Sequence, residues 1–133
     1  MGFNNLTLNP SFMLVGHIER NFDIDLRFGN GGESLALSLL NGGEKVEVKT
    51  DRMAHLTGNI AVEFRCRGKL SGISTTEADY WAFVLNQNKR IIFIEVNELK
   101  RIGRECFKEG LIKNGGDGNK SEMVLIPLIR LIK

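Results

Sequence analysis

The sequence predicts an α/β protein in which helices pack against a mixed β-sheet. Strand-type and helix-type segments alternate along the chain, which is typical of a layered α/β architecture. The hydrophobic content of 42% is enough for a core, and 133 residues fit one domain, with residues 1–20 as a candidate N-terminal arm. No apolar run approaches the roughly 20 residues that span a bilayer, so we expect no membrane partner.

The first elements are predicted from the alternation of apolar and polar residues and from the glycines that end a helix. Residues 12–15 are a short apolar run that could be a strand or part of the arm. Residues 21–28 alternate apolar and polar side chains, which predicts a half-buried strand. Residues 31–41 are rich in helix formers and end at Gly42 and Gly43, which predicts a short helix.

Two strands are expected next, over residues 44–50 and 59–66. The polar connection between them ends in Thr57-Gly58-Asn59, a turn signal, so the two strands could pair as a hairpin. Ser74-Thr75-Thr76-Glu77 resembles a helix start, which predicts a helix over 78–85.

The last predicted elements are a strand, a helix and a final strand, with a loop before the final strand. Residues 91–96 are strongly β-branched and predict a buried strand. Asn97 can cap a helix that runs to about Lys108 and stops at Gly110. Residues 114–120 read as a flexible loop, and 123–127 as a final strand that ends near its proline.

Charge and cysteine usage add little by themselves. The net charge is +2, which is no electrostatic signature of a polyanion partner. Cys66 and Cys106 are far apart and in no metal-ligand spacing. The first residues lack a basic region with an apolar stretch behind it, so we expect no secretory signal. We therefore expect a reducing, cytoplasmic setting in which both thiols are structural.

The residues that carry chemistry lie on the two predicted middle strands. Side chains two apart share a face of a strand, so Glu47 and Lys49 would point the same way, with Asp51 beyond them and Glu63 on the next strand. Carboxylates suit a hard cation such as Mg²⁺, with Mn²⁺ able to substitute, and a nearby ammonium suits a phosphate. The alternative is a solvated ladder of charges with no catalytic role.

The chain resembles the PD-(D/E)XK nuclease superfamily, and within it the small phage-type Holliday-junction resolvases. The resemblance covers about residues 28–96. It is carried by Glu33, by Glu47-Val48-Lys49 as the E-x-K element, and by two downstream segments. These segments are Thr57-Gly58-Asn59 followed by Glu63, and Ser71-Gly72-Ile73 followed by Thr76, Ala78, Asp79 and Trp81.

The resemblance implies a restriction-endonuclease-like mixed β-sheet flanked by helices. It also implies a Mg²⁺-dependent endodeoxyribonuclease, a homodimer that cuts branched DNA such as a four-way junction, in the cytoplasm of a bacterial or phage-infected cell.

One departure from the family pattern leaves two alignments open. The family has an aspartate on the strand before E-x-K, whereas the residues just before Glu47, 41–45, contain no such strand. Either Asp51 fills that role or the role is lost, or else Glu47 takes the place of the aspartate and Glu63 that of the glutamate. We favour the second, in which Lys49 has moved to the earlier strand.

The resulting hypothesis assigns each residue a role. The catalytic set is Lys49, Glu47, Glu63 and Glu33, and the metal ligands are Glu47, Glu63 and Asp51. The residues expected to contact DNA are Arg65, Arg67, Lys69 and His55. The rival functions are a non-catalytic nucleic-acid-binding module with the same fold and a protein-interaction subunit of a larger complex.

Overall fold

The computed structural model describes residues 31–133 of the chain. The chain divides into two units, residues 1–44 and residues 45–133. The strands expected at 12–15 and 21–28, and the arm expected at 1–20, lie outside the described residues. The expectation of one domain over 1–133 stays a prediction.

The described part of the first unit is helix α2 (Gly31–Leu40), as the sequence predicted. The helix ends where the glycines begin. Gly42 has a φ of 75°, in the left-handed region that favours glycine, and the Gly43 amide donates to the Ser38 carbonyl at 2.8 Å.

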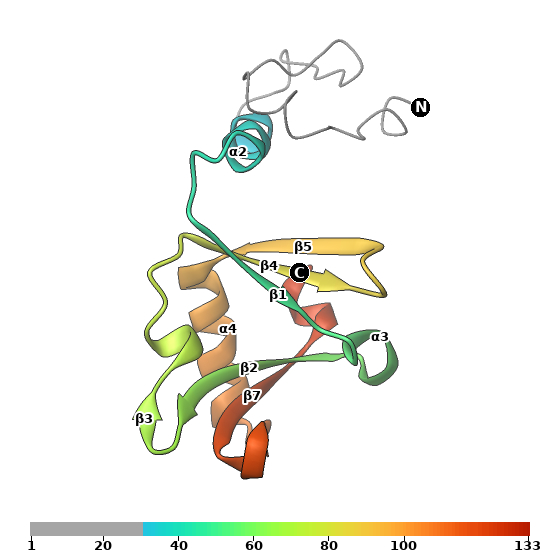
Figure 1. Cartoon of the computed structure of the whole chain (residues 1–133). Coiled ribbons are helices and arrows are strands. Elements are labelled where there is room, and N and C mark those ends of the chain that lie inside the picture. The colour runs from blue at the N-terminus through green and yellow to red at the C-terminus, as the bar shows by residue number, and fades with distance from the viewer. Residues whose placement is uncertain (1–30) are drawn as a thin grey trace. The chain divides into compact units, whose positions relative to one another are not determined.

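The second unit holds two sheets, which Figure 1 shows one above the other with a helix beside them. The first sheet has the order β1–β4–β5, formed by β1 (Val46–Thr50), β4 (Tyr80–Leu85) and β5 (Arg90–Glu95). β1 pairs with β4 in parallel, and β4 pairs with β5 antiparallel, so this sheet is mixed.

The second sheet is antiparallel throughout, with the order β3–β2–β7–β6. Its members are β2 (Asn59–Cys66), β3 (Lys69–Leu70), β6 (Ile112–Gly115) and β7 (Ser121–Pro127). β7 confirms the last predicted strand. The expected flexible loop at 114–120 instead holds the end of β6 and a short 3-10 turn, Asp117–Asn119.

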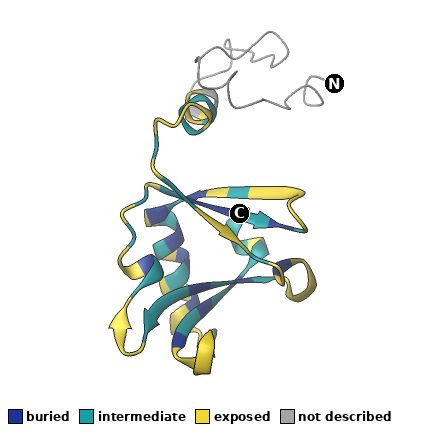
Figure 2. Ribbon diagram, in the orientation of Figure 1, coloured by how far each residue is buried: buried dark blue, intermediate teal, exposed yellow. Residues whose placement is uncertain are grey.

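Helix α4 (Val96–Lys108) packs against β7 and contacts β5. Buried residues on α4, on β4 and β5 of the first sheet, and on β2 and β7 of the second form one core, as the dark stretches of Figure 2 show. Its largest fully buried side chains are Trp81, Phe83, Ile60, Leu99, Ile126, Val62 and Cys106. Burial raises the pKa of the Cys106 thiol, which fits the structural role expected for it.

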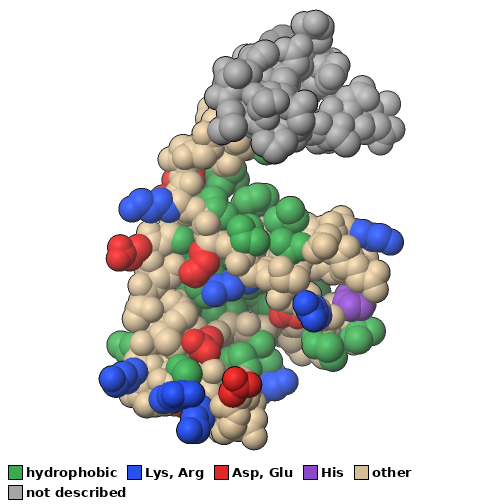
Figure 3. Space-filling view, in the orientation of Figure 1, with side chains coloured by type: hydrophobic (Ala, Val, Ile, Leu, Met, Phe, Trp, Pro, Cys, Tyr) green, Lys and Arg blue, Asp and Glu red, His purple; other side chains and the backbone are tan. Residues whose placement is uncertain are grey.

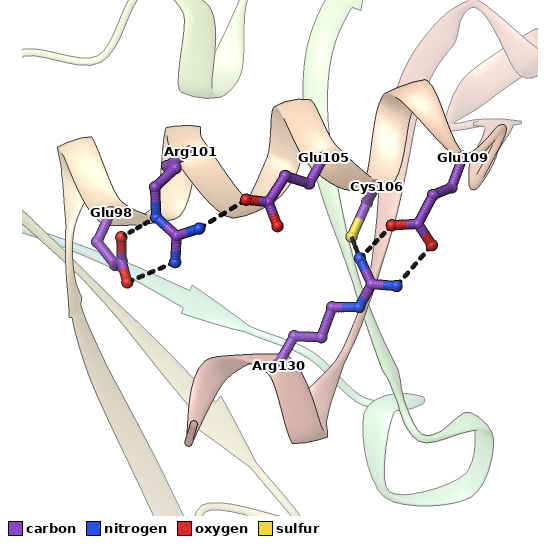
Figure 4. A network of polar contacts seen from close by, with 6 residues as sticks. All are labelled: Glu98, Arg101, Glu105, Cys106, Glu109 and Arg130. Carbon is purple, nitrogen blue, oxygen red and sulfur yellow. Dashed lines mark hydrogen bonds and ion pairs between the residues drawn. The ribbon is translucent and has the colours of Figure 1, made fainter.

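Two ion-pair groups lie along α4 (Figure 4). Arg101 binds Glu98 and Glu105, with closest approaches of 2.6 Å to each. Arg130, in the short C-terminal 3-10 helix Leu128–Leu131, forms two hydrogen bonds to Glu109 just past the end of α4.

The helix predicted over 78–85 is wrong, because residues 80–85 form strand β4 and residues 78–79 are not helical. β4 lies in the middle of its sheet and is buried on both faces at Trp81, Ala82 and Phe83, so its residues are apolar almost without interruption. Such a run has no alternation that would distinguish it from a buried helix. The preceding residues form only a 3-10 turn, Gly72–Ser74.

The hairpin predicted between residues 44–50 and 59–66 is also wrong. Both strands exist, but β1 pairs with β4 while β2 pairs with β7 and β3. A short helix, α3 (Ala54–Thr57), stands between β1 and β2 and directs the chain from one sheet to the other. The architecture is therefore mixed α/β with two sheets, rather than one sheet flanked by helices. Within the described residues, no helix has both the length and the apolar character needed to cross a bilayer.

Candidate active site between the two sheets

Strand β1 places Glu47 and Lys49 on one face, as the alternation predicted. The Lys49 ammonium lies 3.6 Å from the Glu47 carboxylate and 4.9 Å from the centre of the Trp81 ring. Val48 points to the opposite face and is 62% exposed. The charged face of β1 is therefore the one beside the core, since its partners in register, Trp81 and Phe83, are buried.

A cavity of about 210 Å³ opens between the two sheets, and three of the predicted site residues line it. Lys49 comes from β1, Asp51 follows the end of β1, and Glu63 comes from β2. Trp81, Phe83 and Met123 supply apolar walls. Figure 3 shows acidic and basic side chains near one another on the face where the sheets meet. The cavity thus brings one ammonium and two carboxylates together by the packing of two sheets.

The Glu63 carboxylate is held in its ionised form. Hydrogen bonds from the side chains of Ser121 and Ser71 lower the pKa of Glu63 most. Burial opposes them, and the positive charge of Lys49 adds a smaller lowering effect. The Ser71 hydroxyl donates to Glu63 at 2.9 Å. A register shift between Glu63 and Arg65 marks a bulge at this point of β2, a feature that often re-aims side chains beside active sites.

Asp51 fixes the chain at the turn from β1 into α3. Its Oδ1 accepts hydrogen bonds from the amides of Met53 and Ala54 at 2.9 and 2.8 Å, and its Oδ2 accepts from the Ala61 amide at 3.4 Å. The last bond ties the end of β1 to β2. A carboxylate has further lone pairs, so these bonds leave acceptor capacity toward the cavity.

Gly72 explains the Ser-Gly-Ile segment of the sequence pattern. It lines the cavity, and its φ of 56° is in the left-handed region. A Cβ at this position would overlap the carbonyl oxygen of Glu63. Only glycine lets the 3-10 turn lie directly against β2, which brings Ser71 within reach of the Glu63 carboxylate.

The remaining pattern residues have structural contacts. The Thr76 hydroxyl accepts a hydrogen bond from the Trp81 indole at 3.1 Å, so it holds a strand residue instead of capping a helix. Asp79 accepts from the Lys45 amide at 2.9 Å, which fixes the start of β1 beside β4. Trp81 is buried, as expected, although on a strand.

Three of the residues predicted to contact DNA, Arg65, Arg67 and Lys69, lie on the hairpin of β2 and β3, and His55 lies elsewhere on α3. Arg65 is paired with Glu122 at 3.4 Å. Arg67 and Lys69 are exposed at the turn between β2 and β3. His55 is exposed on α3 and lines a different hollow.

Two basic residues that the sequence analysis missed lie closer to the candidate site. Arg52 and Lys113 line a hollow of about 420 Å³ that shares Thr50, Asp51 and Ala61 with the first cavity. Arg52 is adjacent to Asp51 in the sequence, which was an available signal. Lys113 reaches this place only because β6 pairs with β7, which no local pattern indicates.

Glu47 and Glu63 stand on different sheets, so the expected arrangement on neighbouring strands is wrong. Glu33 belongs to α2 in the first unit, and its side chain is outside what the structure describes. Across residues 31–133, no three His, Cys, Asp or Glu side chains gather closely enough to hold a metal ion. Comparison of the chain with protein-family models, curated proteins and solved structures found no match.

Proposed function

We propose that the protein is a metal-dependent endodeoxyribonuclease with its centre in the cavity between the two sheets. The observation that supports the proposal is the lining of that cavity by Lys49, Asp51 and Glu63. Phosphodiester hydrolysis needs a cation or ammonium at the phosphate and ionised carboxylates beside it, and these groups meet at one place.

Asp51 and Glu63 are the residues that would hold Mg²⁺, or Mn²⁺ in its place. Mg²⁺ keeps several waters and is usually bound through one or two carboxylates together with substrate phosphate, so a pair is a sufficient donor set. The lowered pKa of Glu63 keeps that ligand ionised. When bound, the cation would neutralise phosphate charge and lower the pKa of a water molecule.

Lys49 would place its ammonium against the scissile phosphate. Glu47 lies 3.6 Å from that ammonium and would orient it, which gives Glu47 a positioning role in place of the metal-ligand role predicted for it. The neighbouring Arg52 and Lys113 would contact backbone phosphates, together with Arg67 and Lys69 at the turn between β2 and β3. Glu33 stays a candidate supporting carboxylate.

The resemblance to the PD-(D/E)XK nucleases supplies the finer proposal. The mixed sheet β1–β4–β5 with α4 would be the counterpart of the restriction-endonuclease-like core. The substrate would be branched DNA, and the protein would act as a homodimer, since two symmetric cuts need two sites.

The proposal is tested by incubating the full chain with duplex, single-stranded, flap and four-way-junction DNA. Cleavage of branched DNA is expected with Mg²⁺ or Mn²⁺ and none is expected with a chelator present. Failure to cut any of the four substrates with either cation would overturn the proposal.

The rival function is a non-catalytic nucleic-acid-binding module, and one observation favours it. The carboxylates of Asp51 and Glu63 are already hydrogen-bonded to protein groups. Trp81 is the single tryptophan and lines the same cavity, so bound Mn²⁺ should quench its fluorescence, and Glu63→Gln should reduce the quenching. DNA binding without any quenching would favour the rival.

A further inference from the structure

A second cavity, of about 320 Å³, lies between helix α4 and the second sheet. Its wall on β2 and β7 includes Val62, Val124 and Ile126. The candidate active site takes Ala61, Glu63 and Met123 from the same strands. Because neighbouring side chains in a strand point to opposite faces, the two cavities lie on opposite faces of this sheet.

The lining of the second cavity is mostly apolar. Phe64 and Phe107 stand edge to face, with ring centres 5.6 Å apart, and Phe107 is 51% exposed. Gly103 has no side chain on this wall, where a Cβ would be in ordinary van der Waals contact with Val124 and Ile126, at 3.8 and 4.0 Å. The exposed ring of Phe107 and the missing side chain at Gly103 leave apolar surface at the cavity.

Three polar residues line this cavity. Ser74 donates its hydroxyl to the Phe64 carbonyl at 2.8 Å, whereas the other two are cationic. The other arginines near α4 are neutralised, Arg101 by Glu98 and Glu105, and Arg130 by Glu109 (Figure 4). Lys100 and Arg104 line the cavity one helical turn apart. In the part of the chain that the structure describes, neither side chain forms a hydrogen bond or an ion pair.

We propose that this cavity binds a small amphipathic anion, with an aromatic or short acyl body and one carboxylate. The apolar body would fill the space beside Gly103, Phe64 and Phe107, and the carboxylate would lie between Lys100 and Arg104. Pockets for small ligands have volumes from about 300 Å³ upward and combine apolar walls with a few orienting polar groups. This site is separate from the proposed nuclease centre, and neither proposal depends on the other.

The test uses 1-naphthoate and its uncharged counterpart, 1-naphthalenemethanol, with the full chain. Titrations are followed by calorimetry and by amide NMR shifts. The acid should bind at least about tenfold more tightly than the alcohol, because hydrogen bonds to charged groups are the stronger ones. The shifts should concentrate on residues 99–107 and on β2.

Three variants separate the site from a general attraction between charges. Arg104→Gln should weaken naphthoate binding about tenfold. Gly103→Leu should abolish binding, because its side chain would fill the cavity. Lys108→Gln is the matched control, since it removes a charge one turn further along α4 from a residue outside the lining.

The proposal is overturned if acid and alcohol bind equally, if Gly103→Leu binds as well as wild type, or if Lys108→Gln weakens binding as much as Arg104→Gln. Lys100→Gln provides a second rim variant that leaves the helix backbone unchanged, should Gly103→Leu disturb the amide spectrum. Unchanged binding by Lys100→Gln and Arg104→Gln together would also contradict it.

Discussion

The residues around the Glu63 carboxylate stabilise its ionised form. Ser121 and Ser71 supply hydrogen bonds, and Lys49 supplies a positive charge across the gap between the sheets. All three favour the charged form over the neutral one. The same contacts link the site to stability, because a group whose pKa falls on folding stabilises the folded state when it is ionised.

Glu63→Gln should therefore lower the free energy of unfolding more at about pH 7 than at about pH 3. The contribution of Glu63 is present above its unfolded pKa of roughly 4.3, and it is lost as the pH falls through the lower folded value. Chemical denaturation followed by Trp81 fluorescence at both pH values measures the difference. An equal cost at the two pH values would contradict the hydrogen-bonded environment assigned to Glu63.

Gly72 gives a second prediction at the residue scale. Gly72→Ala should destabilise the protein by more than about 2 kcal/mol. Alanine would be strained in the left-handed backbone conformation of this position, and its Cβ would overlap the Glu63 carbonyl. Gly58→Ala is the matched control, since Gly58 has a φ of 77° but open space around it. Its cost should be about 1 kcal/mol in the same denaturation experiment. Equal losses of unfolding free energy in the two variants would contradict the close approach of Gly72 to β2.

At the scale of elements, the N-cap of helix α4 is Glu95, which the sequence analysis did not predict. The Glu95 side chain accepts a hydrogen bond from the Glu98 amide at 2.9 Å, whereas Asn97, the predicted cap, is exposed within the first turn. Glu95→Ala should therefore cost about 1 kcal/mol of unfolding free energy, and Asn97→Ala should cost little. Thermal unfolding of both variants checks this, and a larger loss for Asn97→Ala would contradict it.

Which elements exist was largely predictable, and the one wrong type has a physical reason. Helices α2 and α4 and strands β1, β2, β5 and β7 were predicted close to their observed bounds. β4 was not, because residues 80–85 form an apolar run with no period, preceded by residues that can cap a helix. Its aromatic and β-branched composition was the better signal.

At the scale of the whole molecule, the pairing of strands could not be predicted. β1 finds its partner in β4, and β2 finds its partner in β7 at the far end of the chain. Such long-range pairs depend on which strand faces the core can cover, and the local sequence pattern of a strand does not indicate its partner. The sequence therefore predicted a single mixed sheet, whereas the strands form two sheets.

The candidate site was predictable in part for the same reason. Lys49, Asp51 and Glu63 were proposed from residue type and spacing, and they do line one cavity. They meet across two packed sheets rather than along a hairpin, so Glu47 lies beside Lys49 and on a different sheet from Glu63. Lys113 was missed because its place depends on the pairing of β6 with β7.

The most direct measurement of the central claim compares wild type with Lys49→Ala on four-way-junction DNA. Affinity is measured by gel shift without divalent cation, and cleavage is measured under single-turnover conditions with Mg²⁺. Lys108→Gln, a charge-matched change on α4, serves as the control. We predict that Lys49→Ala binds within about threefold of wild type but cuts at least about a hundredfold more slowly, since one electrostatic contact at the reacting group is worth that much. Cutting by Lys49→Ala at the wild-type rate would show that the cavity between the sheets is not the hydrolytic centre.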